Sequence, residues 1–490
     1  MSARSAWSTS RGVSAGQADL ARVDHTRQRM AHWDRAAALG TSAWSRAYHR
    51  RLIQVYRSLI PPGQRVLEIG CGTGDLLAAL SPSIGVGVDF SSRMLREATR
   101  RHPCQRFVRA DAHALDFGET FDFVILSDLV NDLWDVEVAF KQLARVTAAG
   151  SRVIVNFYSR LWEAPLEGAR SLGLATPLLD QNWLTVEDVA NLLNLADFEV
   201  TRHWDELLVP LDVPVVTPLA NQYLARFWPF SQVTLTHFVV ARPQPRPTAS
   251  AQPLVSVIVP ARNEAGNIAA IFDRTPEMGA GTELVFVEGH SRDDTYATIE
   301  RERARRPERR AQLLRQEGRG KGDAVRLGFA HAHGDVLMIL DADLTVAPED
   351  LPRFLSALIS GKGELINGVR LVYPMEKQAM RFFNLLGNKF FSLAFSWLLG
   401  QSVKDTLCGT KVLWAADYQR LAAQRTYFGD FDPFGDFDLL FGAAKLNLKI
   451  VDLPIRYRER TYGSTNIQRW RHGLLLLRMV LFAARRIKFV

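Results

Sequence analysis

The chain has 490 residues, too many for one hydrophobic core and suited to two domains of about 240 residues each. Hydrophobic residues make up 47% and charged residues 23%, which is typical of globular protein and argues against long disorder. The cysteines, Cys71, Cys104 and Cys408, are too few and too scattered for a disulfide framework or a zinc cluster, so we expect reduced, intracellular thiols. The net charge is +8, but no aromatic-basic stacking pattern accompanies it, and nucleic acid is not an expected partner.

Composition along the chain predicts where the domains meet. Residues 1–40 are polar, without the apolar core of a secretory signal, and are expected to form a loose tail followed by helix. Residues 243–253 read P-Q-P-R-P-T-A-S-A-Q-P, a proline-rich stretch typical of a semi-rigid linker. The expected domains are therefore 1–242 and 254–490. Both alternate short β-rich runs with helical patterns, which favours α/β folds with mainly parallel sheets.

In the first half, an apolar run breaks into glycines. Residues 65–69 are expected to form a strand, followed by Gly70, Gly72 and Gly74 and a helix over 75–80. Glycine is needed where backbone must approach a ligand closely, and a helix N-terminus offers free N–H groups. The pattern predicts a nucleotide-type cofactor at this turn.

Two later strands in the first half end in carboxylates. The strand predicted over 85–88 ends at Asp89, which could accept hydrogen bonds from both ribose hydroxyls of a bound adenosine. The strand predicted over 107–110 ends at Asp111, a placement suited to the adenine amino group. This series of strand ends is a stronger signal than the glycine turn alone.

These segments, E-I-G-C-G-T-G (68–74), V-D-F-S (88–91), R-A-D-A (109–112) and F-D-F-V-I-L (121–126), resemble the class I S-adenosylmethionine-dependent methyltransferases. The resemblance covers roughly residues 48–241 and implies a Rossmann-like fold with S-adenosylmethionine as cofactor. It places Glu68 at the methionine end. The implied cofactor-binding residues are Glu68, Gly70, Gly72, Gly74, Asp89 and Asp111.

The sequence does not identify the methyl acceptor. Asp128 and Asp132 could deprotonate a hydroxyl, or could be solvated caps of a loop. Trp162, Trp183 and Trp204 could line an acceptor pocket or pack in the core. The alternative to methyl transfer is a regulatory module that only binds the cofactor.

In the second half, an apolar strand ends in a pair of carboxylates. The strand expected over 336–340 leads into Asp341-Ala342-Asp343, whose carboxylates lie around a tight strand end. Hard oxygen ligands suit Mg²⁺ or Mn²⁺, which would bridge the diphosphate of a nucleotide donor. An earlier strand, over 255–259, ends in P-A-R-N-E (260–264), about eighty residues before the carboxylates, which makes the motif specific.

The second half resembles the GT-A-fold glycosyltransferase family 2, and particularly its polyprenyl-phosphate sugar synthases such as dolichol-phosphate mannose synthase. The matching segments include E-G-H-S-R-D-D-T (288–295), G-K-G-D-A-V (320–325), D-A-D (341–343) and D-T-L-C-G-T-K (405–411), within about residues 253–465. The resemblance implies that Asp341 and Asp343 hold the metal. The implied nucleotide-sugar-binding residues are Pro260, Arg262, Asn263, Glu264, Glu288, Lys321, Asp323, Asp341 and Arg460.

The chemistry of the acceptor decides which further residues would be catalytic. A neutral hydroxyl acceptor needs a general base, for which Asp436 and Asp438 are candidates unless they cap a helix. A polyprenyl phosphate is already anionic and needs cations instead, and Arg370 and Arg381 match the acceptor-phosphate arginines of the synthases. The rival interpretation of this half is a nucleotidyltransferase.

No stretch reaches the roughly 18 uncharged apolar residues that a spanning helix needs. The C-terminus is nevertheless amphipathic and basic, and residues 470–490 could lie on an anionic membrane surface or pack on their own domain. We therefore expect a bifunctional methyltransferase and glycosyltransferase, cytoplasmic and peripheral to the inner face of the membrane, with a nucleotide sugar as donor and a lipid phosphate as acceptor.

Overall fold

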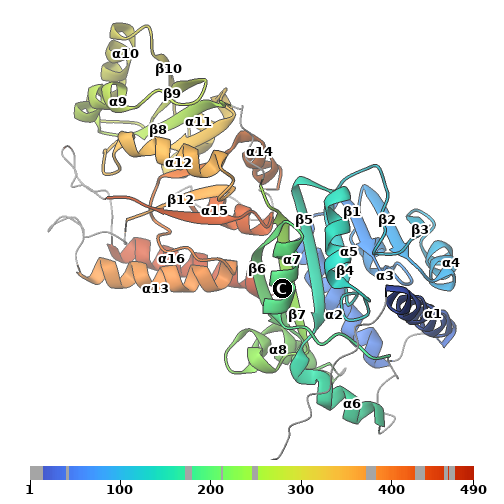
Figure 1. The fold of residues 1–490 in the computed structure, drawn as a ribbon. Coiled ribbons are helices and arrows are strands. Elements are labelled where there is room, and N and C mark those ends of the chain that lie inside the picture. The colour runs from blue at the N-terminus through green and yellow to red at the C-terminus, as the bar shows by residue number, and fades with distance from the viewer. Residues whose placement is uncertain are drawn as a thin grey trace, which may run out of the picture. The chain divides into compact units, whose positions relative to one another are not determined.

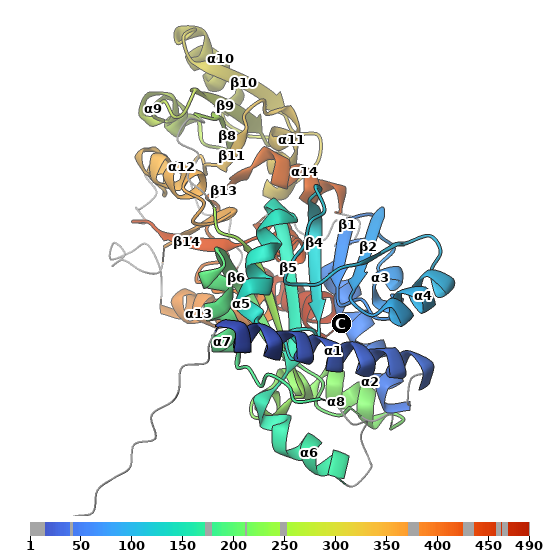
Figure 2. The same cartoon turned by 45° about the vertical axis from the view of Figure 1, so that its right-hand side comes forward.

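A computed structural model describes residues 15–39, 43–171, 179–210, 213–245, 252–370, 382–424, 436–456, 462 and 469–489. The chain divides into two compact units, residues 1–243 and 244–490, and each contains one seven-stranded sheet (Figures 1 and 2). Both sheets are mixed, mostly parallel and covered by helices, which confirms the α/β fold class in both halves.

The sheet of the N-terminal unit has the order β3-β2-β1-β4-β5-β7-β6. Its strands are β1 (Arg65–Ile69), β2 (Ile84–Asp89), β3 (Arg106–Arg109), β4 (Phe121–Ser127), β5 (Thr147–Tyr158), β6 (Phe198–Glu206) and β7 (Thr236–Pro243). The first five strands are parallel, and β7 runs antiparallel to β5 and β6. The strand order reverses between β1 and β4, and ligands of open α/β sheets bind beside the carboxyl ends of strands at such a point.

Alternating side chains of these strands point to opposite faces of the sheet, and helices cover both faces. Val66 packs with α2 (Ala43–Leu59) and α3 (Asp75–Ala79), whereas Leu67 packs with α5 (Val136–Gln142) and α7 (Val186–Leu195). Successive strand residues point to opposite faces, so an uninterrupted apolar run is what a doubly covered sheet requires. The remaining helices of the unit are α1 (Ala15–Leu39), α4 (Ser92–Arg101), α6 (Glu163–Ser171) and α8 (Val216–Gln222), and α1 packs against α4 (Figure 2).

The sheet of the C-terminal unit has the order β10-β9-β8-β11-β13-β12-β14. Its strands are β8 (Leu254–Ala261), β9 (Gly281–Glu288), β10 (Arg310–Arg315), β11 (Val336–Ile339), β12 (Leu365–Val369), β13 (Lys411–Trp414) and β14 (Ile450–Pro454). Strand β13 is antiparallel to both β11 and β12, and the other pairs are parallel.

Helices cover both faces of this second sheet. One core cluster contains α9 (Ile268–Arg274), α10 (Thr295–Arg305) and α12 (Leu351–Ile359). The other contains α11 (Lys321–His331), α13 (Phe382–Leu399), α14 (Ala415–Ala423), α15 (Asp436–Lys445) and α16 (Arg469–Ala483), with α13 and α16 side by side (Figure 1). None of the helices in the described ranges is long and apolar enough to span a bilayer.

Candidate functional site

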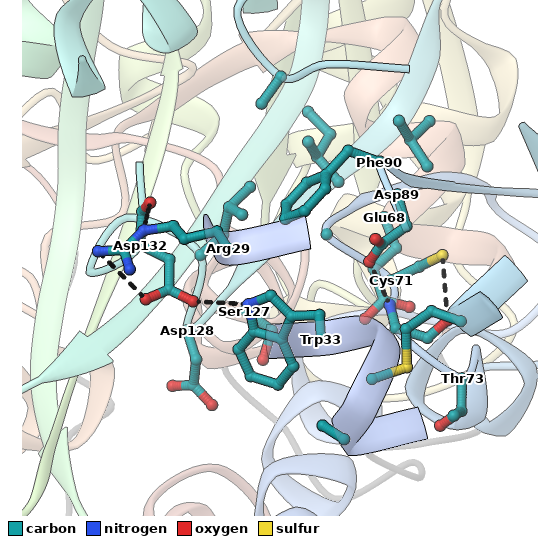
Figure 3. A pocket seen from close by; sticks show the side chains of 18 of the residues that line it. Arg29, Trp33, Glu68, Cys71, Thr73, Asp89, Phe90, Ser127, Asp128 and Asp132 are labelled. Carbon is teal, nitrogen blue, oxygen red and sulfur yellow. Dashed lines mark hydrogen bonds and ion pairs between the residues drawn. The ribbon is translucent and has the colours of Figure 1, made fainter. Parts of the chain in front are cut away.

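A cavity of about 1520 Å³ opens at the carboxyl ends of β1, β2 and β4. Five of the six predicted cofactor residues line it: Glu68, Gly70, Gly72, Asp89 and Asp111. Figure 3 shows Glu68 and Asp89 on this wall. Gly74, the sixth, is not on the wall. The cavity therefore brings most of the residues selected from the sequence to one place.

The three glycines of the turn all adopt left-handed backbone. Their φ angles are 74° at Gly70, 50° at Gly72 and 73° at Gly74, a region that L side chains rarely occupy. Nothing lies within 4 Å of a Cβ built at Gly72, so a ligand can approach its backbone, whereas a Cβ at Gly74 would come 2.6 Å from the Phe107 ring. Gly72 therefore serves close approach to a ligand, and Gly74 serves packing and the start of α3.

The carboxylates beside the turn are held by backbone N–H groups. Asp89 accepts hydrogen bonds from Gly72 N at 3.0 Å and Ser91 N at 2.8 Å, and Glu68 accepts one from Leu77 N at 3.0 Å. Burial raises the pKa of Asp89 and raises that of Glu68 to about 8. At neutral pH Glu68 is therefore mostly protonated unless a cation lies beside it.

Asp111 has a different environment from these two carboxylates. His113 donates to it from its backbone N at 3.0 Å, and the Nδ1 atom of the same ring lies 2.7 Å away. The hydrogen bond with the His113 ring is the main cause that lowers the pKa of Asp111, to about 2. Asp111 is therefore a fixed anion at the end of β3.

Helix α1 supplies a wall of the cavity that the sequence did not predict. Trp33 Nε1 donates to Asp132 Oδ2 at 3.0 Å, and Arg29 Nε donates to the backbone carbonyl oxygen of Asp132 at 2.7 Å (Figure 3). The sequence signalled only a helix here, because its partners lie about a hundred residues further along the chain. Of the candidate tryptophans, Trp204 stacks on Phe238 with ring centroids 5.2 Å apart, and none of the three lines the cavity.

In the C-terminal unit, the loops after β8 and β9 are joined by hydrogen bonds. Asn263 donates from its backbone N to Ser291 Oγ at 3.0 Å and accepts at Oδ1 from Arg292 N at 2.7 Å. Glu264 is buried and accepts from Asn267 Nδ2 at 2.8 Å. Pro260 lies near the end of β8, Arg262 lies in the loop after β8, and Glu288 is the last residue of β9.

The predicted metal and diphosphate residues meet beyond β11. Lys321, the first residue of α11, lies with Nζ 2.6 Å from Asp341 Oδ1. A Cβ built at Gly409 would come 2.1 Å from that Nζ and 2.2 Å from Asp341 Oδ2, so the segment before β13 closes over the pair. Asp343 accepts hydrogen bonds at Oδ1 from Thr345 N at 3.1 Å and Thr345 Oγ1 at 2.7 Å, which fixes its orientation.

Other predicted residues have protein partners. Asp323 accepts from Gln316 Nε2 at 2.9 Å, and Asp438 lies 3.7 Å from Arg326. Arg370 donates from Nε and Nη2 to the two carboxylate oxygens of the buried Asp405, at 2.7 and 2.9 Å. Arg381, Arg460 and the side chain of Asp436 lie outside the described residues.

The described residues contain no cluster of three or more His, Cys, Asp or Glu side chains that could hold a metal ion by themselves. Two carboxylates on one strand end still fit a hard cation whose remaining ligands come from phosphate and water, as is usual for Mg²⁺. A site of this kind is completed by its substrate.

Comparisons with known proteins match both halves. The model of glycosyl transferase family 2 matches residues 256–408, and a methyltransferase domain matches residues 66–150. The chain is 30% identical over 221 residues to glycosyltransferase AglJ of Haloferax volcanii, covering 45% of this chain and 68% of AglJ. It is 25% identical over 230 residues to an undecaprenyl-phosphate 4-deoxy-4-formamido-L-arabinose transferase of Edwardsiella ictaluri, covering 46% and 64%.

The N-terminal half has its own relatives. Over 105 residues it is 35% identical to a demethylmenaquinone methyltransferase of Streptomyces griseus, covering 20% of this chain and 44% of the relative. The chain thus spans less than half the length of that relative. The protein is a two-part transferase: it belongs to glycosyl transferase family 2 through its C-terminal unit, fused to an S-adenosylmethionine-dependent methyltransferase domain.

Proposed function

We propose that the C-terminal unit transfers a sugar from a nucleotide-sugar donor to a lipid phosphate. The observation that carries this is the meeting of Lys321 and Asp341 at 2.6 Å beside Asp343, at the first turn of α11. A lysine, two carboxylates and a helix N-terminus together suit a diphosphate with its divalent cation. Asp341 and Asp343 would hold Mg²⁺ or Mn²⁺, which would neutralise charge developing on the leaving diphosphate.

The donor's nucleoside would lie against the loops after β8 and β9. Asn263, Ser291 and Arg292 fix these two loops to each other, so the side chains of Arg262 and Glu288 are presented from a rigid base. A lipid-phosphate acceptor agrees with the name of the Edwardsiella ictaluri relative, an undecaprenyl-phosphate 4-deoxy-4-formamido-L-arabinose transferase. An anionic acceptor needs no general base, so Asp438 is not required as one.

A membrane surface is the place where such an acceptor would be met. Helix α13 exposes Phe390 and Leu393, by 56% and 73%, and α16 exposes Leu477 and Leu481, by 42% and 57%. The basic side chains of Arg478, Arg485 and Arg486 are exposed on the same C-terminal segment. Apolar stripes next to basic residues suit an anionic bilayer surface, and we place the protein at the cytoplasmic face of the membrane.

Replacing Leu393, Leu477 and Leu481 together by Glu should abolish flotation with anionic liposomes. Each change puts a charge where the helix would enter the headgroup layer and leaves the buried Leu476 and Met479 in place. The unaltered chain should float at low salt and lose binding as salt rises or as anionic lipid is removed. The matched control is Leu195→Glu, on an exposed leucine of the other unit, which should float normally. If the unaltered chain stays in the soluble fraction at low salt, the membrane proposal is wrong.

For the N-terminal unit, we propose methyl transfer from S-adenosylmethionine bound in the 1520 Å³ cavity. Asp89 would accept the ribose hydroxyls, Glu68 would face the methionine end, and Asp111 would lie near the adenine. The left-handed Gly70 and Gly72 would let the backbone approach the cofactor. When bound, the cofactor supplies an electrophilic methyl group on a sulfonium.

Asp89→Ala should weaken S-adenosylmethionine binding by about 1.5–3 kcal/mol, because an ionised acceptor of hydrogen bonds is lost. Isothermal calorimetry on the full chain measures this. Since Asp89 also accepts from Gly72 N and Ser91 N, Asp89→Asn is the matched variant, which keeps one acceptor oxygen and should lose less. Unchanged affinity in a folded Asp89→Ala protein would contradict the assignment.

A further inference from the structure

Two carboxylates follow β4 on the cavity wall, and their surroundings differ. Asp132 receives the Trp33 indole N–H at 3.0 Å, and its Oδ1 lies 3.9 Å from the Arg29 guanidinium. Figure 3 shows Asp132 joined to both partners, with Asp128 apart from them. Asp132 is therefore already engaged by a guanidinium and an indole N–H.

Asp128 has no such cation. Its Oδ1 accepts hydrogen bonds from Tyr48 Oη at 2.7 Å and Asn156 Nδ2 at 2.6 Å, while its backbone N donates to the Asn156 carbonyl at 3.0 Å. In the part of the chain that the structure describes, no lysine, arginine or histidine lies within 4.0 Å of its carboxylate, and Oδ2 accepts no protein hydrogen bond. Asp128 lines the cavity, so Oδ2 is the oxygen left to meet a ligand.

A buried network fixes this carboxylate. Tyr56 Oη donates to Asn156 Oδ1 at 2.7 Å, and Thr236 Oγ1 lies 3.5 Å from Tyr48 Oη. Asp128 itself adopts a left-handed φ of 55°, an uncommon conformation that the surrounding bonds hold in place. The network therefore fixes the Asp128 carboxylate through Oδ1, with Oδ2 left on the cavity wall.

The buried position of Asp128 also shifts its pKa. Burial, with a further contribution from the Asp132 charge, raises its pKa to about 7, although the hydrogen bonds from Tyr48 and Asn156 act in the opposite direction. Tyr48 donates to Asp128 and Tyr56 donates to its partner Asn156, both as neutral hydroxyls, since burial raises their pKa values well above 10. A carboxylate with a pKa near 7 can both take and release a proton at neutral pH.

We propose that the methyl acceptor of the N-terminal unit carries a neutral hydroxyl group, which enters this cavity and gives its proton to Asp128 Oδ2. The proposal rests on the methyl transfer proposed above. The hydroxyl oxygen forms the bond to the methyl carbon, the carbon–sulfur bond breaks with its electron pair on sulfur, and the hydroxyl proton moves to the carboxylate. The products are a methyl ether, a neutral thioether and a protonated Asp128, which then loses its proton to water.

Asp128 itself disfavours a cationic amine as the acceptor. The charges on the rest of the wall are mixed, because Arg29, Arg46 and Arg109 line the cavity together with the carboxylates of the cofactor site. An ammonium next to Asp128 would be stabilised in its charged form and would resist losing its proton. The 1520 Å³ volume exceeds the roughly 300–1,000 Å³ of most ligand pockets, which leaves room for an acceptor beside the cofactor.

The first test measures the proton on Asp128 without any turnover. In the full chain labelled with ¹³C at aspartate carboxyls, NMR should show a resonance titrating near pH 7 that disappears in Asp128→Asn. The same resonance should persist in Asp132→Asn and in the exposed-surface control Asp116→Asn. If no aspartate resonance titrates near pH 7, or if the resonance is lost in Asp132→Asn instead, Asp128 is not the base.

The second test uses two hydroxyl compounds of different acidity as probes, phenol and 4-nitrophenol, with radiolabelled S-adenosylmethionine. Asp128→Asn should lower methylation of phenol by about 10²–10⁴-fold, the usual contribution of a general base. Methylation of 4-nitrophenol, which ionises near neutral pH and needs no base, should change far less. Equal losses on both probes, or transfer to an amine such as benzylamine and to neither hydroxyl compound, would overturn the proposal.

Calorimetry separates this failure from a failure of the proposed function. If S-adenosylmethionine does not bind the unaltered chain, methyl transfer itself is wrong. If it binds equally to the unaltered chain and to Asp128→Asn, while the variant methylates both probes at the unaltered rate, only the role of Asp128 is wrong.

Discussion

Asp343→Asn is expected to lower sugar transfer by orders of magnitude while leaving the fold intact. The carboxylate follows β11, and its Oδ1 accepts from Thr345 N at 3.1 Å and from Thr345 Oγ1 at 2.7 Å. An asparagine oxygen can accept both bonds, so the turn should survive. The charge that would hold a divalent cation is lost, and with it the stabilisation of the leaving diphosphate. Release of the nucleoside diphosphate from candidate nucleotide sugars measures the effect.

Two controls accompany this measurement. Asp273→Asn removes a carboxylate from an exposed ion pair with Arg306, and such pairs contribute little, so transfer should be unchanged. Excess EDTA should stop transfer by the unaltered chain, and added Mg²⁺ or Mn²⁺ should restore it. Full activity in the chelator would mean that the two carboxylates have some other role.

The features predicted well from the sequence are local. The run over 65–69 followed by Gly70 and Gly72 predicted β1 with the bounds that it has in the structure, because an apolar strand and a left-handed turn are decided by consecutive residues. The positions of the Asp side chains at the ends of β2 and β11 could be predicted in the same way. Parallel strands present their carboxyl ends at one edge of a sheet, so these side chains were expected at that edge. The α/β fold class needed only the alternation of such runs with helices.

The features that escaped the sequence depend on long-range contacts. The sequence does not distinguish Asp128 from Asp132. Only Asp132 is contacted by Arg29 and Trp33, which lie about a hundred residues earlier in the chain. Likewise, β13 lies between β11 and β12 and is antiparallel to both. The four residues of this strand contain no local signal that predicts this position. Such pairings are decided by tertiary packing, not by local preference.

Arg370 also has a long-range contact that the sequence did not reveal. Family resemblance assigns it to an acceptor phosphate, whereas the structure gives its guanidinium a bidentate protein partner, Asp405, which lies 35 positions away. Burial raises the pKa of Asp405, but the charge and hydrogen bonds of Arg370 more than offset this and hold it below its usual range. The stabilisation from this pair is therefore present at neutral pH and is lost as the pH falls through the depressed pKa.

Arg370→Ala is accordingly expected to destabilise the C-terminal unit by about 3–5 kcal/mol, the usual cost of leaving one partner of a buried ion pair alone. Asp405 is only 1% exposed, so water cannot replace the lost donors at 2.7 and 2.9 Å. The midpoint of urea unfolding measures the loss. Arg353→Ala is the matched control. That arginine is half-exposed, pairs with Asp350 three residues away and donates to the Pro454 carbonyl, so its loss should shift the midpoint much less.

A double variant distinguishes a structural role of Arg370 from a role in binding the acceptor. Arg370→Leu combined with Asp405→Leu removes both charges, so the double variant should regain much of the stability that Arg370→Ala loses, because no unpaired charge remains buried. If Arg370→Ala instead unfolds at the same urea concentration as the unaltered chain but binds a lipid-phosphate acceptor more weakly, the arginine serves the acceptor. The two bonds to Asp405 use two of the five N–H donors of the guanidinium and hold it against a buried carboxylate, and for that reason we expect the stability effect to dominate.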